Sequence, residues 1–181
     1  MADLFLKPVG GEWRGTMVVD VKRPGSSEWT PGGYAIRSSE AGGGGPVRRL
    51  SAPVGGSASA VRVTLTTTPG SPPLNVAGID LDPNGPRLLK GLRAVAKPYR
   101  MQGVASKYGD SGHELTDGVV PDDGFGSGRS IGWRSGGGQV AVSFDLGRVM
   151  PVRSIEVECQ GGGAYAVNWP GSPHALLSAT T

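Results

Sequence analysis

The sequence has few of the residues that stabilise disulfide-linked, highly charged or membrane-spanning proteins. It contains one cysteine, Cys159, in 181 residues, so neither an intramolecular disulfide nor a thiolate metal cluster can form. Charged residues make up 18% of the chain and aromatic residues 6%. No apolar run approaches the roughly 18 residues of a membrane span. We therefore expect neither a disulfide scaffold nor a membrane span.

Glycine and proline are abundant instead. The chain holds 32 glycines and 15 prolines, roughly twice the average share of these two residues. This content excludes a helical bundle, because both residues disfavour helix interiors. The β-branched residues cluster in short runs, a pattern typical of short strands joined by glycine-rich loops. The length allows one large β-domain of the sandwich or barrel kind, or two small ones.

The charge pattern argues against a nucleic-acid partner. The chain has 18 basic and 15 acidic residues, which gives a net charge of +3. The arginines occur singly apart from the adjacent pair Arg48 and Arg49. A nucleic-acid surface requires basic residues clustered on one face, with aromatic residues between them for single strands, and no segment has that density.

Alternation of apolar and polar residues predicts several strands. The clearest is 60–67, with Val61, Val63 and Leu65 on one face and polar residues on the other. Residues 16–22 and 28–30 are expected to pair as a hairpin, and further strands are expected at 76–81, 139–146 and 152–159. Residues 87–97 alone have helical spacing, but glycine interrupts them and proline follows. The proline-rich stop at 82–86 is the best boundary, dividing the chain into segments 1–85 and 86–181.

No motif indicates catalysis. Gly128, Ser130 and Gly132 match the G-x-S-x-G pattern of a nucleophile elbow, which requires a preceding strand and a following helix. Neither flank fits, and with so many glycines the match carries almost no information. The nearest candidates for a pair of catalytic carboxylates are Asp122 with Asp123 and Glu156 with Glu158. The first pair suits a loop, and the second suits the solvent-facing side of a strand. We expect no enzyme.

The second segment resembles a known family. Its motifs are LTDG at 115–118, Trp133, VSFDLG at 142–147, the PVRSIEV strand at 151–157 and a glycine-rich loop ending in Trp169 and Pro170. In this order they are similar to the N-terminal part of discoidin-like, galactose-binding-type modules. Residues 16–31, 60–66 and 76–81 look like the C-terminal part of the same module. The resemblance implies an all-β, jelly-roll sandwich. Two explanations compete: a fragment across a tandem junction, or a circular permutant whose segments complete one sandwich.

The resemblance also implies a structural calcium, because many such modules hold one in a loop. The residues that match the family's ligand positions are Asp117, Asp122, the carbonyls of Glu114 and Val119, and Asp80 on the last strand. Oxygen ligands of this kind suit calcium. Asp80 stands where the family has the longer glutamate. The alternative for Asp117 and Gly118 is a turn closed by the aspartate side chain without metal.

Glycan sites in such modules lie on loops at one end, where an aromatic ring stacks on a sugar and polar side chains bind its hydroxyls. The resemblance implies that the candidates are Trp169, Tyr165 and Tyr108 as aromatic residues, with Arg134, Asn168 and His113 as polar partners. Trp29 and Trp133 match positions that the family packs in the core. For Trp169, core packing and ligand contact are equally open.

The function expected from this resemblance is a non-catalytic carbohydrate-binding or adhesion module that binds a glycan or polysaccharide. The alternative is a structural or protein-interaction spacer. Residues 1–6 have an acid where a signal peptide has basic residues, so extracellular location is expected to come from a longer catalytic or adhesive parent protein.

Overall fold

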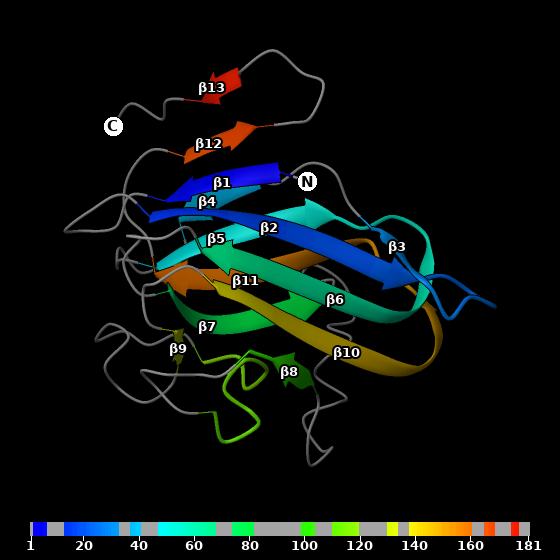
Figure 1. Cartoon of the computed structure of the whole chain (residues 1–181). Helices are drawn as coiled ribbons and strands as arrows, with labels where there is room; N and C mark the ends of the chain where they lie inside the picture. The colour runs from blue at the N-terminus through cyan, green and yellow to red at the C-terminus, as the bar shows by residue number, and fades with distance from the viewer. Residues whose placement is uncertain are drawn as a thin grey trace.

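The described part of the chain is all-β and forms two antiparallel sheets (Figure 1). The computed structural model describes residues 2–6, 13–32, 37–40, 47–67, 74–81, 99–103, 110–119, 130–133, 138–160, 165–168 and 175–177. Among these residues no helix is long and apolar enough to cross a membrane. The segment with helical spacing at 87–97 lies outside the described residues.

The larger sheet has eight strands, with β3 beside β2 and the others in the order β13-β12-β1-β2-β6-β10-β8. Its strands are β1 (Ala2–Leu6), β2 (Trp13–Lys22), β3 (Trp29–Pro31), β6 (Ser57–Thr67), β8 (Arg100–Gln102), β10 (Gly138–Pro151), β12 (Tyr165–Asn168) and β13 (Ala175–Leu177). The smaller sheet has the order β4-β5-β11-β7-β9. Its strands are β4 (Arg37–Glu40), β5 (Val47–Pro53), β7 (Leu74–Leu81), β9 (Ile131–Trp133) and β11 (Ser154–Gln160).

Residue alternation explains the central strands. In β6, Val61, Val63 and Leu65 are buried in the core, as the sequence pattern predicts. The register pairs Val63 with Val19 of β2 and Val142 of β10, so that apolar positions align across three strands. The predicted hairpin of β2 and β3 is confirmed, with Val21 opposite Thr30.

One hydrophobic core lies between the sheets. Its largest fully buried side chains come from both: Phe144 and Met17 from the larger sheet, and Ile155 and Leu81 from the smaller one. Trp133 is 5% exposed and belongs to this core, as expected. Burial of side chains from both layers is what holds the two sheets face to face.

Strands from segments 1–85 and 86–181 pair with one another in both sheets. In the larger sheet β10 pairs with β6, and in the smaller one β11 lies between β5 and β7. The boundary expected at 82–86 lies outside the described residues. Neither sheet can therefore form from one segment alone in the arrangement observed.

Two connections between the sheets run side by side at one end of the sandwich. The chain passes from β5 to β6 through 54–56 and from β10 to β11 through 152–153. Val54 N donates to the Arg153 carbonyl and Val152 N donates to the Gly56 carbonyl, at 2.8 and 2.9 Å. Arg23, from the turn after β2, donates to the Gly55 carbonyl at 2.7 Å. These bonds satisfy backbone groups where the ladders end.

Candidate functional site

The loop at 110–119, which contains the LTDG motif, is bonded to both sides of the sandwich. At its start, the Tyr99 hydroxyl donates to the Asp110 carboxylate at 2.6 Å, and the Tyr99 ring packs edge-on against Phe144 with centroids 6.1 Å apart. Further along, Leu115 is fully buried, and its carbonyl accepts a 2.7 Å hydrogen bond from Ile79 N of β7. In Figure 1 this segment lies below the sheets, between the short edge strands β8 and β9.

The bond to Ile79 explains why the loop is held there. Strand β9 pairs with β7 only at residues 74–76, so the same edge of β7 would be uncovered further along. Leu115 supplies a carbonyl to that edge, which satisfies a buried backbone donor and covers an exposed strand edge.

Carboxylates inside the loop hold its backbone. Ser111 N donates to both oxygens of the Glu114 carboxylate at 2.9 Å, and His113 N donates to Oε2 at 3.2 Å. Gly112, with φ of +102°, donates from its N to Asp110 Oδ1 at 2.7 Å. Partial burial alone would raise the pKa of Glu114, but hydrogen bonds, led by those from Ser111, lower the pKa to about 2. Burial is also the main cause that raises the pKa of Tyr99 well above its ordinary value, followed by the hydrogen bond to the Asp110 carboxylate.

At the end of the loop, Asp117 closes a turn. Val119 N donates to Asp117 Oδ1 at 2.8 Å across Gly118, which has a φ of +72°. This is the side-chain-closed turn typical of aspartate followed by glycine. The turn uses one oxygen of the aspartate carboxylate.

The residues expected to bind calcium gather in part. Glu114, Asp117 and Val119 lie on one loop, and Asp80 directly follows Ile79, the residue to which the loop is bonded. Asp122 lies outside the described residues. The donors are all oxygen atoms, which suits calcium in kind. Within the described ranges, however, no three His, Cys, Asp or Glu side chains come together as a metal-binding group.

The residues expected to bind a glycan fall at two separate places. His113 is exposed on the loop beside β7, whereas Tyr165 and Asn168 are the first and last residues of β12. Strand β12 is separated from β8 by five strand spacings, roughly 24 Å across the sheet. The structure therefore does not bring His113 together with Tyr165 and Asn168. Tyr108, Arg134 and Trp169 lie outside the described residues.

Ser130, in the G-x-S-x-G pattern, lacks the surroundings of a nucleophile. It is fully buried, and the chain continues into strand β9 rather than into a helix. A nucleophile elbow requires an exposed serine at a strand-to-helix turn. The strand that follows Ser130 confirms that this flank does not fit the motif, and the residues before it lie outside the described part of the chain.

Trp29 was expected in the core, and this prediction is wrong. It is half-buried on the outer face of the larger sheet, because its strand pairs Trp29 with Lys22, whose side chain points away from the core. The Arg62 guanidinium lies 4.5 Å from the centre of the Trp29 ring, and the Lys22 ammonium lies 5.1 Å from it. Both distances are within the range of cation–π interactions.

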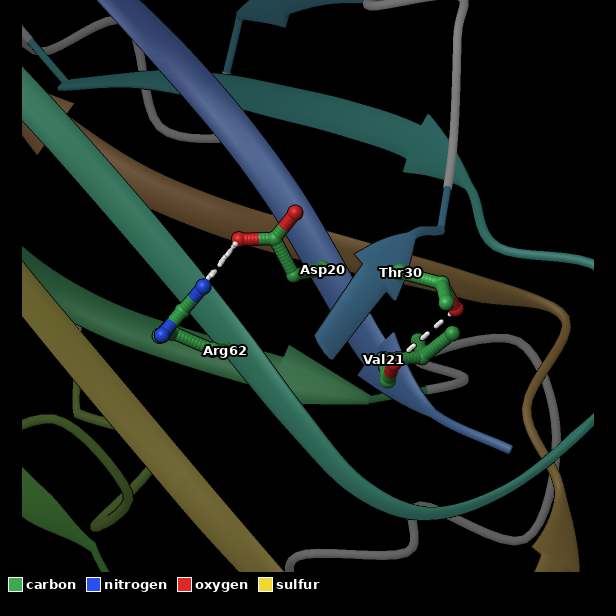
Figure 2. A network of polar contacts seen from close by, with 4 residues as sticks. All are labelled: Asp20, Val21, Thr30 and Arg62. Atoms are coloured by element: carbon green, nitrogen blue, oxygen red, sulfur yellow. Dashed lines mark hydrogen bonds and ion pairs between the residues drawn. The ribbon is translucent and has the colours of Figure 1, made fainter. Parts of the chain in front are cut away.

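An ion pair completes this outer-face cluster. Arg62 Nη2 and Nε donate to Asp20 Oδ2 at 2.8 and 3.2 Å (Figure 2). Figure 2 also shows Thr30, whose hydroxyl donates to the Val21 carbonyl at 3.2 Å and ties β3 to β2. The sequence motifs did not predict this cluster of Asp20, Lys22, Trp29 and Arg62. The available signal was that Asp20, Lys22 and Arg62 occupy the polar positions of alternating strands.

Compared with models of protein families, with curated proteins and with solved structures, the chain gives no match. The fold defines the class as a two-sheet antiparallel β-sandwich.

Proposed function

We propose that this protein is a non-catalytic carbohydrate-binding or adhesion module, a jelly-roll sandwich in which segments 1–85 and 86–181 close as in a circular permutant of the discoidin-like arrangement. The observation that carries the proposal is the bond between Leu115 and Ile79. It brings the LTDG loop to the strand that contains Asp80, which is the pairing of loop and last strand that the family resemblance implies. Binding rather than catalysis is favoured because the loop's acids hold backbone N–H groups.

Calcium, where bound, would be held by Asp117 and Asp80 with the carbonyls of Glu114 and Val119, and by Asp122 from the following segment. It would supply charge that fixes the loop relative to β7. The glycan would contact the exposed His113 on the loop beside β7. The other residues that the resemblance implies for glycan binding are Tyr108, Arg134, Trp169, Tyr165 and Asn168. Such a module would serve a longer extracellular parent protein.

Glycan binding by the whole chain tests this proposal. The chain would be applied to an array of neutral and charged glycans with calcium and again with chelator, and hits would be quantified by calorimetry. We expect binding that falls on chelation and weakens in Asp117→Asn and His113→Ala. The matched controls are Asp145→Asn and Glu28→Ala, which change exposed residues away from the loop. Absence of binding to every glycan would favour a structural spacer instead.

A further inference from the structure

Three described cations lie on the outer face of the larger sheet, and two of them, Arg62 and Arg100, share one row of the register. In the register, Asp20 of β2 lies opposite Arg62 of β6, which lies opposite Ser143 of β10, which lies opposite Arg100 of β8. Lys22 lies two residues from Asp20 and so on the same face. Three strand spacings of about 4.8 Å make this row about 14 Å long.

Trp29 fixes two of these cations in place. Its ring holds both the Arg62 guanidinium and the Lys22 ammonium within cation–π distance, and Asp20 holds Arg62 from the other side. Long basic side chains ordinarily lose rotamer entropy when they bind a ligand. Here much of that entropy is already lost in the free protein, because contacts with Trp29 and Asp20 position the charged groups before a ligand binds.

Among the side chains that the structure describes on this face, cations outnumber carboxylates by three to two. Its described carboxylates are Asp20, which is paired with Arg62, and Asp145, whose Oδ1 accepts a hydrogen bond from Gly147 N. Arg100 is exposed and Lys22 is half-buried. In Figure 1 no described segment crosses in front of the middle of β2, β6 and β10. Among the described residues, the middle of this face is therefore uncovered and carries more cations than carboxylates.

We propose that this face, defined by Lys22, Arg62 and Arg100 with Trp29 as a positioning residue, binds an acidic polysaccharide. The inference deepens the proposed function, on which it rests, by naming a ligand class and a second site away from the loop. The anionic groups of a sulfate- or carboxylate-bearing sugar chain would pair with Lys22, Arg62 and Arg100, which lie on β2, β6 and β8 of one sheet face. Single-stranded nucleic acid fits less well, because it also requires aromatic faces for its bases and the one described tryptophan here already contacts two cations.

The test uses the whole chain with dextran sulfate as probe and neutral dextran as the uncharged control, in affinity electrophoresis and calorimetry at low and high salt. Binding to dextran sulfate alone, weakened by salt, is expected. Lys22→Gln and Arg100→Gln are each expected to lower affinity about fivefold. The matched control is Arg148→Gln, which removes an exposed cation from the end of β10 outside the row.

Trp29 is tested by Trp29→Leu and Trp29→Tyr. Loss of affinity in the leucine variant with recovery in the tyrosine variant, both with unchanged far-ultraviolet circular dichroism, supports the positioning role. Equal losses in Lys22→Gln, Arg100→Gln and Arg148→Gln would overturn the proposal, since attraction would then be diffuse. Equal binding of neutral dextran, or tighter binding of a single-stranded oligonucleotide, would also overturn it.

The two proposals fail separately. Failure of the sheet-face variants to alter dextran sulfate binding, with calcium-dependent binding of neutral glycans intact, would remove only this second site. Loss of the loop's glycan binding, with the effects of Lys22→Gln and Arg100→Gln on dextran sulfate intact, would remove only the proposed loop function.

Discussion

Replacing Leu115 by alanine should destabilise the whole sandwich, although Leu115 lies in a polar loop. Its side chain is fully buried in the core shared by both sheets, and its carbonyl bonds to β7. Truncation of a buried leucine costs about 2–5 kcal/mol. For a chain of this length that corresponds to a fall in Tm of about 4–20 °C.

The measurement is urea unfolding followed by tryptophan fluorescence and circular dichroism, with the slope compared between variants. Val149→Ala is the matched control, because Val149 is 50% exposed and its truncation should change stability by less than about 0.5 kcal/mol. If Leu115→Ala lowered the free energy of unfolding no more than Val149→Ala does, Leu115 would not be part of the core that stabilises the sandwich, and the loop would be peripheral to the fold.

Three further changes test the loop and the end of the sandwich. Tyr99→Phe removes a hydrogen bond to a carboxylate and should lower the free energy of unfolding, measured in urea, by about 1.5–3 kcal/mol. Because the pKa of Tyr99 is raised in the folded state, its contribution to stability is present below pH 10 and is lost as pH rises further. Because the pKa of Glu114 is lowered in the folded state, its contribution to stability is present above pH 4.5 and is lost as pH falls towards 2. The Tm of Glu114→Gln should therefore depend less on pH in this range than the Tm of the parent. Parallel profiles of Tm against pH would contradict this prediction. Gly56→Ala should lower Tm more than Gly25→Ala. Both glycines have positive φ, but at Gly56 the added carbon would lie 2.9 Å from Arg23 Nη1, and this flexible group would have to move away from its hydrogen bond to the Gly55 carbonyl; equal losses would show that the displacement costs nothing.

The central strands could be predicted from sequence because their apolar residues alternate over long runs. In β6 the period of two fixes which side chains face the core once one face is buried. Trp29 could not be placed in the same way. Its strand has three residues, too few for a period, and its face depends on pairing with Lys22.

The candidate sites depend on contacts between residues distant in sequence, which explains why they were only partly predictable. The ion pair of Asp20 and Arg62 joins residues 42 positions apart, and only the register of β2 and β6 reveals it. The turn at Asp117 is local, so its sequence indicates it directly. The attachment of Leu115 to β7 requires the folded sheet edge.

Thermal unfolding of the whole chain, in calcium and then in chelator, tests whether the two segments form one sandwich that binds calcium. Circular dichroism and tryptophan fluorescence would be recorded together. We expect a single transition seen by both probes, because both segments contribute strands to both sheets. We also expect a higher Tm in calcium, because calcium that binds only the folded state stabilises it by mass action. Two separate transitions would contradict the single sandwich, and equal Tm values with and without calcium would contradict the metal site.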